Sequence, residues 1–158
     1  MAIDLRNDVF APVLARMKAR AESLGYVKHF PRTGIEGWFK VEVVAALGKK
    51  VLALQNKGPD LVIEDGTQSG MKLELKAATN FDRAWFLDAI RKYGTPCLFL
   101  GDGTGRTGFK AAAKDNFEVV GAEVFLDKSG GKWIMGLVKP RRRTLSRRVR
   151  RPAAQNRI

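Results

Sequence analysis

Residues 58–76 read GPDLVIEDGTQSGMKLELK. This stretch predicts two short apolar strands joined by a polar turn that contains glycine. Alternate side chains of a strand point to opposite faces, so Lys72, Glu74 and Lys76 share one face of the second strand. An antiparallel register with Asp60 opposite Glu74 or Lys76 gathers these charges on one surface, whereas a slip of one residue scatters them. The hairpin therefore predicts two carboxylates and one ammonium close together.

Two neighbouring carboxylates repel each other and lose hydration unless a cation lies between them. Mg²⁺ suits that position, because it is usually held by one or two carboxylates and keeps several waters. Lys76 would then orient an activated water or stabilise charge that builds on a phosphate. The same three charges also fit an ordinary solvated face of a hairpin. The hairpin alone leaves both interpretations open.

The pattern Pro59-Asp60, thirteen residues, then Glu74-Leu75-Lys76 resembles the PD-(D/E)xK nuclease superfamily, which includes restriction-endonuclease-like and Holliday-junction-resolvase-like proteins. The common core of that superfamily runs helix, three strands, helix, strand, and residues 34–100 read in the same order. The resemblance implies hydrolysis of phosphodiester bonds that leaves a 5′-phosphate. It implies that Mg²⁺ or Mn²⁺ is held by Asp60, Glu74 and the backbone carbonyl of Leu75, with Lys76 as a catalytic residue.

In the resembled superfamily, a glutamate on the helix before the hairpin often completes the metal site. Residues 34–47 predict that helix and contain two candidates, Glu36 and Glu42. Glu42 lies among apolar residues, where an acid needs a reason to be, whereas Glu36 is near the helix start, where the dipole favours an acid. The sequence therefore favours Glu42 as the catalytic and metal-binding residue, with Glu36 as the alternative.

The chain predicts an α/β fold with a restriction-endonuclease-like core, in which a central mixed sheet is flanked by helices. Helices are expected over residues 4–24, 34–47 and 81–92, and Pro12 suggests that the first helix begins near Asp8. Further strands are expected over residues 50–55 and 96–100, and residues 117–126 and 132–138 predict an extra C-terminal hairpin. The lone Cys97 lies in an apolar strand, so a buried, inert thiol is expected.

Two further segments carry basic residues that we expect to contact nucleic acid. Residues 101–108 read GDGTGRTG, a glycine spacing similar to that of nucleotide-binding loops. The lysine that a phosphate-binding loop needs is missing, and the required βαβ context is absent, so nucleotide binding is rejected. The alternative is a glycine-rich loop beside a nucleic-acid groove, in which Arg106 contacts the backbone of the nucleic acid. Arg83, on the polar face of the third helix, is a second candidate, although a solvated face is the favoured explanation for it.

Charge is concentrated at the C-terminus. The net charge is +13, and residues 139–158 hold nine Lys/Arg and no acids. The sequence predicts a nuclease-like domain over residues 1–139 and an Arg-rich tail over residues 140–158 that is disordered without a partner. Nucleic acid, most readily DNA, is the expected partner, because the tail lacks an apolar face for a membrane. Its candidate contacts are Arg141, Arg142, Arg143, Arg147, Arg148, Arg150 and Arg151.

Three functions fit these observations. The first is a metal-dependent endonuclease that hydrolyses phosphodiester bonds of DNA. The sequence leaves duplex, junction and single-stranded substrates open, and RNA as well. It also leaves open a homodimer or a larger assembly. The second is a basic nucleic-acid-binding protein without catalysis, which has no need to gather Asp60, Glu74 and Lys76. The third is a structural subunit of a ribonucleoprotein. The chain has neither a signal core nor an apolar run of membrane-spanning length, so an intracellular, cytoplasmic protein is expected.

Overall fold

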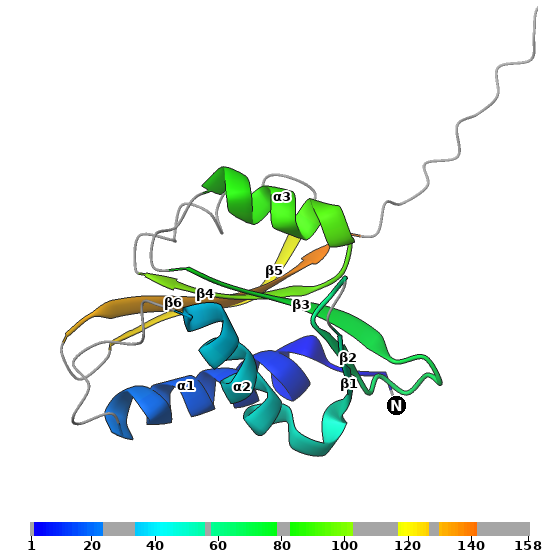
Figure 1. The fold of residues 1–158 in the computed structure, drawn as a ribbon, viewed down its shortest axis with the longest axis horizontal. Coiled ribbons are helices and arrows are strands. Elements are labelled where there is room, and N and C mark those ends of the chain that lie inside the picture. The colour runs from blue at the N-terminus through cyan, green and yellow to red at the C-terminus, as the bar shows by residue number, and fades with distance from the viewer. Residues whose placement is uncertain are drawn as a thin grey trace, which may run out of the picture.

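The computed structural model describes residues 2–23, 34–55, 58–78, 83–102, 117–126 and 130–141. These residues form one mixed six-stranded sheet in the order β1-β2-β3-β4-β6-β5, with helices on both faces (Figure 1). The predicted α/β class with a mixed sheet is therefore confirmed. The strands are β1 (Val51–Leu54), β2 (Leu61–Ile63), β3 (Met71–Ala78), β4 (Cys97–Asp102), β5 (Phe117–Leu126) and β6 (Lys132–Pro140).

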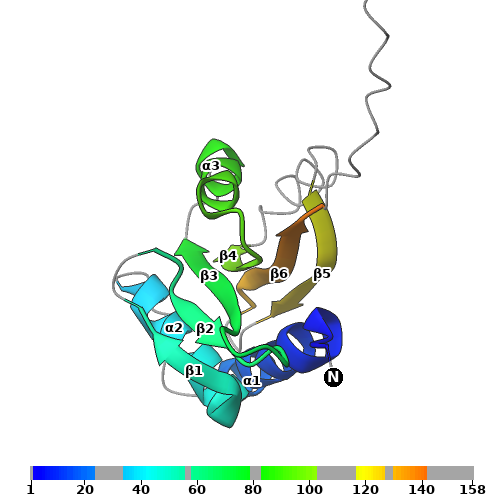
Figure 2. The same ribbon diagram turned by 90° about the vertical axis from the view of Figure 1, so that its right-hand side faces the viewer.

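Two helices cover one face of the sheet and one helix covers the other. Helix α1 (Ala11–Ser23) and helix α2 (Ile35–Leu47) lie together on one side, and α3 (Arg83–Tyr93) lies on the opposite side (Figures 1 and 2). A 3₁₀ turn, η2 (Gly48–Lys50), joins α2 to β1. The chain from α2 to β4 thus runs helix, three strands, helix, strand, which is the predicted order of elements.

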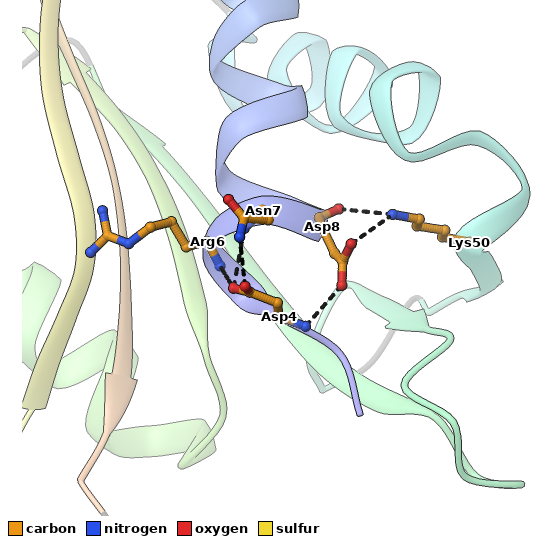
Figure 3. Close-up of polar contacts among 5 residues, drawn as sticks. All are labelled: Asp4, Arg6, Asn7, Asp8 and Lys50. Carbon is orange, nitrogen blue, oxygen red and sulfur yellow. Dashed lines mark hydrogen bonds and ion pairs between the residues drawn. The ribbon is translucent and has the colours of Figure 1, made fainter. Parts of the chain in front are cut away.

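The first helical stretch begins at Leu5, within the expected range of residues 4–24 and before the start near Asp8 that Pro12 suggested. A π-helical segment, η1 (Leu5–Phe10), precedes α1, and the Asp4 carboxylate caps it by accepting hydrogen bonds from the N–H groups of Arg6 and Asn7 (Figure 3). Pro12 was expected to mark the helix start because it has no N–H to donate to Asp8. The helical stretch nevertheless runs through Pro12, and Lys50 Nζ donates to the Asp8 carbonyl at 3.4 Å (Figure 3).

The apolar residues form two clusters, one on each face of the sheet. Leu73, Leu75 and Ala77 of β3 belong to the larger cluster, with the buried side chains of α1 and α2. Cys97 and Phe99 of β4 belong to the smaller cluster, with Leu87 and Ile90 of α3. Because side chains alternate along β3, its charged residues face away from the larger cluster. Cys97 is fully buried, as predicted, and burial raises the pKa of its thiol.

Two glycines are required by close approaches. Gly70 enters β3 at a φ of +69°, and a Cβ there would lie 2.7 Å from the Ile63 carbonyl oxygen. Gly121 lies against the Phe10 ring, and a Cβ would approach that ring to 2.6 Å. The register of β5 shifts between Val119 and Gly121, next to this contact. Gly70 therefore closes the β2–β3 hairpin, and Gly121 admits η1 onto the sheet.

The predicted C-terminal hairpin is confirmed, since β5 and β6 pair antiparallel, and β6 in turn pairs with β4. Strand β6 runs to Pro140, which pairs with Phe117. Among the described residues, none of the helices has the length and apolar character needed to cross a membrane.

Candidate active site

The candidate site lies where β3 changes its pairing partner. Residues 71–73 of β3 pair antiparallel with β2, and residues 74–78 pair parallel with β4. The register matches Leu61 with Leu73, so Asp60, one residue before β2, comes opposite Glu74. This is one of the registers predicted to bring the three charged residues together.

Asp60 is held at this point by the backbone of β3. Glu74 donates its N–H to the Pro96 carbonyl on the β4 side, so the next N–H, that of Leu75, points toward β2. The Asp60 carboxylate accepts that hydrogen bond at 2.9 Å through Oδ2. The backbone donor between Glu74 and Lys76 therefore fixes the position of the Asp60 side chain.

Glu74 is buried without full compensation of its charge. Only 2% of the residue is exposed, and its Oε2 has no hydrogen-bond partner in the described part of the chain. Its other oxygen, Oε1, lies 3.1 Å from Lys76 Nζ. Burial raises the pKa of Glu74, the Lys76 hydrogen bond opposes this rise, and the charges of Asp60 and Glu36 add to it. The carboxylate thus has one oxygen available for a further cation or donor.

Lys76 lies between two glutamates. Its Nζ is 3.1 Å from Glu74 Oε1 and 3.8 Å from Glu36 Oε1, at the N-terminal end of α2. Burial alone would lower the pKa of Lys76, but the hydrogen bond to Glu74 and the charges of Glu36, Glu74 and Asp60 raise it above its usual value. Lys76 is therefore a charged ammonium at neutral pH, which can donate hydrogen bonds but cannot accept a proton.

Glu36 rather than Glu42 is the glutamate of α2 that approaches Lys76. Glu42 is 3% exposed, and its two oxygens bind Arg16 Nε at 2.6 Å and Arg20 Nε at 2.9 Å, both from α1. The preference for Glu42 rested on its apolar surroundings, and these two arginines supply the reason for an acid there. The geometry favours Glu36, the alternative, as the third carboxylate of the site.

Lys40 is a further member of the site that the sequence motif did not indicate. Its Nζ lies 3.3 Å from Asp60 Oδ1, and it follows Glu36 by one turn of α2. The spacing of four residues puts Glu36 and Lys40 on one face of the helix, and that face meets the hairpin at both Lys76 and Asp60. This i, i+4 pair of opposite charges was visible in the sequence, but nothing local indicated which element it would face.

The donor set is compatible with a hard divalent cation. Within the described residues, no group of three or more His, Cys, Asp or Glu side chains is assembled in ligand-like geometry. Mg²⁺ needs only one or two carboxylates, however, with water and phosphate in its other positions. Asp60 and Glu74 supply two carboxylates, and the buried Oε2 of Glu74, which has no hydrogen-bond partner among the described residues, is a free acceptor position in the site.

No family model, curated protein or solved structure matches this chain. The interpretation of the site therefore depends on its own geometry and on the sequence motif.

The remaining predicted contacts lie elsewhere or outside the described residues. Arg141 is exposed and lines a cleft of about 890 Å³, together with Lys139, Glu118 and Pro96, where β4 begins. Neither Asp60 nor Glu74 is among the described lining residues of that cleft. Arg83 is the first residue of α3, but its side chain is outside the described set. Arg106, Arg142, Arg143, Arg147, Arg148, Arg150 and Arg151 also lie outside the described residues.

Proposed function

We propose that this protein is a metal-dependent nuclease that hydrolyses phosphodiester bonds of DNA. The observation that carries the proposal is the hydrogen bond from the Leu75 N–H to Asp60 Oδ2, which brings the aspartate to the Glu74-Leu75-Lys76 segment. The motif resembles that of PD-(D/E)xK nucleases, and α2 through β4 follow the order of elements in their core. A restriction-endonuclease-like core is part of this proposal.

Asp60 and Glu74, with the Leu75 carbonyl, would hold Mg²⁺ or Mn²⁺, and Glu36 would lie close to them. A bound divalent cation supplies water activation and neutralises charge at the scissile phosphate. The proposal is supported by the buried carboxylate of Glu74, whose Oε2 has no hydrogen-bond partner among the described residues. It is also supported by the raised pKa of Glu74, which burial causes and to which the nearby carboxylates of Asp60 and Glu36 add.

Lys76 would act as a fixed positive charge. Its ammonium is held by Glu74 and Glu36, so it needs little rearrangement to donate a hydrogen bond to a phosphate oxygen that gains charge. Its raised pKa keeps it protonated at neutral pH, so it is suited to stabilise charge and not to remove a proton. Glu36 would set the position of Lys76 from the helix side.

The test is a cleavage assay with the full-length chain and Mg²⁺ or Mn²⁺, on duplex, junction and single-stranded DNA and on RNA. We expect cation-dependent cleavage that leaves 5′-phosphate ends and is abolished in Glu74→Ala. Glu22 of α1 is exposed and lies outside the site, so Glu22→Gln is a control that removes a carboxylate elsewhere. Binding without cleavage of any substrate, with either metal, would favour a non-catalytic nucleic-acid-binding protein.

A further inference from the structure

A second ionic cluster lies on the α1 side of α2. Arg16 and Arg20 are four residues apart on α1, and both reach the buried carboxylate of Glu42. We call the two arginines the arginine pair. Their side chains are 37% and 40% exposed, whereas that of Glu42 is 3% exposed. A buried anchor thus holds two cations that remain accessible to solvent.

The arginine pair retains most of its hydrogen-bonding capacity. A guanidinium carries five N–H donors, and the contact of each arginine with Glu42 is through Nε, at 2.6 Å for Arg16 and 2.9 Å for Arg20. Across the described residues, neither side chain makes another hydrogen bond or ion pair. The terminal amino groups are therefore available to an acceptor that is not among those residues.

The charges in this cluster do not balance. One arginine would neutralise Glu42, but two leave a surplus of one positive charge. Like charges four residues apart on a helix repel each other, so the second arginine is not explained by helix stability. Anchoring through Nε limits the rotation of both guanidiniums and so lowers the entropy that a ligand would have to remove. These features describe a preorganised site for an anion.

The candidate active site itself does not attract an anion. Its three carboxylates are those of Asp60, Glu74 and Glu36, and its two ammonium groups are those of Lys40 and Lys76. Without a cation these five groups sum to one negative charge, which repels a phosphate. Attraction of a phosphodiester chain must therefore come from other parts of the molecule, and the body outside the tail is only mildly basic.

We propose that the arginine pair binds the phosphodiester backbone of the nucleic-acid substrate and that Glu42 is its positioning residue. The proposal rests on the nuclease function proposed above. The planar fork of arginine matches two phosphate oxygens, and this contact reads charge and not base sequence. Residues 36 and 42 are separated by about 9 Å along the axis of α2, which is a few phosphate spacings of a strand.

The test is equilibrium binding of the full-length chain to a fluorescent duplex and to a single strand, in EDTA so that no cleavage occurs, over a series of KCl concentrations. Arg16→Gln and Arg20→Gln should each reduce the slope of log affinity against log salt. For each phosphate that is no longer neutralised, the expected reduction is about 0.9 for the duplex and about 0.7 for the single strand. Lys18→Gln removes one charge from the same helix at an exposed pair with Glu123, and it should leave the slope unchanged.

Slopes for Arg16→Gln and Arg20→Gln that equal the wild-type slope would mean that the cluster only joins α1 to α2. An equal reduction in Lys18→Gln would mean that only total charge matters, which also overturns the proposal. Glu42→Gln removes one negative charge and so raises the net charge by one. If binding depended on net charge alone, the slope would become steeper. If Glu42 positions the arginine pair, the slope should become flatter.

If Glu42→Gln does not fold, Arg16→Lys and Arg20→Lys provide the second measurement. They keep the charge but lose the fork, so we expect the slope to persist while affinity falls several-fold; unchanged affinity would overturn the proposal. The two proposals fail separately. If the protein cleaves DNA but its salt slope is unchanged in Arg16→Gln and Arg20→Gln, only the proposal for the arginine pair is refuted. If the slope falls in both variants but the protein cleaves no substrate, only the nuclease proposal is refuted.

Discussion

Two acidic residues are buried in the described part of the chain, Glu42 and Glu74, and their surroundings differ. Both oxygens of Glu42 bind arginines, so its burial is compensated by hydrogen bonds with charged donors. Glu74 has one ammonium at Oε1 and no partner at Oε2 in the same set of residues. Burial without compensation is costly, and such residues cluster at functional sites. For this reason we propose a chemical role for Glu74 and a positioning role for Glu42.

Glu74→Gln should raise the melting temperature at neutral pH. The folded state raises the pKa of Glu74 above its ordinary value of 4.5, so the protein loses stability as the pH rises through that value toward the folded pKa. Glutamine cannot ionise, so we expect a gain on the order of 1 kcal/mol in the free energy of unfolding, or about 3 °C in melting temperature for a chain of this size.

Calorimetry across pH measures this effect, and the gap between the two proteins should close below pH 4.5. Mn²⁺ or Mg²⁺ should raise the melting temperature of the wild type and not that of Glu74→Gln, because the ion binds the folded site. A cation response that persists in the variant would mean that the metal binds at another place.

Glu36→Gln should lower kcat more than Glu42→Gln does, because Glu36 contacts Lys76 whereas Glu42 binds the arginine pair. Glu42→Gln should lower the free energy of unfolding by about 2 kcal/mol, the size of a hydrogen bond between charged groups. Single-turnover cleavage and chemical denaturation measure the two effects. The opposite ranking of kcat would return the catalytic role to Glu42.

Lys40→Met should tighten divalent-cation binding. Lys40 Nζ lies 3.3 Å from Asp60 Oδ1, where it would compete with the proposed metal ion for the carboxylate. Both side chains are partly exposed, so we expect a gain of about 1 kcal/mol, or roughly a fivefold lower Kd. Titration calorimetry with Mn²⁺ measures it, with the exposed Lys49→Met as the control. Weaker binding in Lys40→Met would show that Lys40 supports the cation site.

At the level of secondary structure, the site depends on the hairpin register and on the change of partner along β3. Residues 71–73 pair with β2 and residues 74–78 with β4, so the β2 chain separates from β3 at Glu74. The Leu75 N–H on that side is satisfied by the Asp60 side chain. A one-residue slip of the hairpin would move Asp60 away from this donor.

Gly70→Ala tests the role of the hairpin. Alanine at a φ of +69° costs about 1–2 kcal/mol, and its Cβ would also lie 2.7 Å from the Ile63 carbonyl oxygen. We expect a decrease of at least about 2 kcal/mol in the free energy of unfolding and a smaller thermal response to Mn²⁺.

The control for this variant is Gly130→Ala. Gly130 also has a positive φ, of +81°, but a Cβ there meets no described atom within 4 Å. Denaturant unfolding and hydrogen exchange of residues 61–63 and 71–78 distinguish the two. If both variants lose equal stability, backbone strain alone explains the effect and the close approach to β2 is unimportant.

Across the molecule as a whole, charge is distributed unevenly. The net charge is +13, and residues 142–158 contribute seven arginines and no acid. A nuclease needs long-range attraction for a polyanion together with a local site that accepts a cation, and these demands conflict if they are met at one place. In the proposed nuclease the two demands are met at different places, since the acidic cluster lies in the body and the dense positive charge in the tail.

Deletion of residues 142–158 should weaken DNA binding and flatten its salt dependence by about 0.9 for each phosphate that the tail neutralises. Turnover at saturating DNA should persist, because the proposed site lies in the described body. Binding isotherms over a salt series and single-turnover rates test this. A full-length variant with these seven arginines changed to glutamine separates charge from length. A salt slope that is unchanged in both variants would exclude a nucleic-acid contact by the tail.

Features that depend on local patterns could be predicted from the sequence. Alternation over residues 58–76 predicted the hairpin and the shared face of Glu74 and Lys76, and the order of helices and strands followed from periodicity and glycine positions. The C-terminal hairpin was predicted for the same reason. These features are set by neighbours in the chain, so they can be read without knowledge of distant contacts.

Which charged residues meet was settled by tertiary packing. Helical periodicity separated the faces of Glu36 and Glu42, but the packing of α1 against α2 gave Glu42 its arginines and left Glu36 beside Lys76. The approach of Lys40 to Asp60 has the same origin. Spacing within one element fixes which side chains share a face, whereas the partner of that face is fixed by the packing of elements that are distant in sequence.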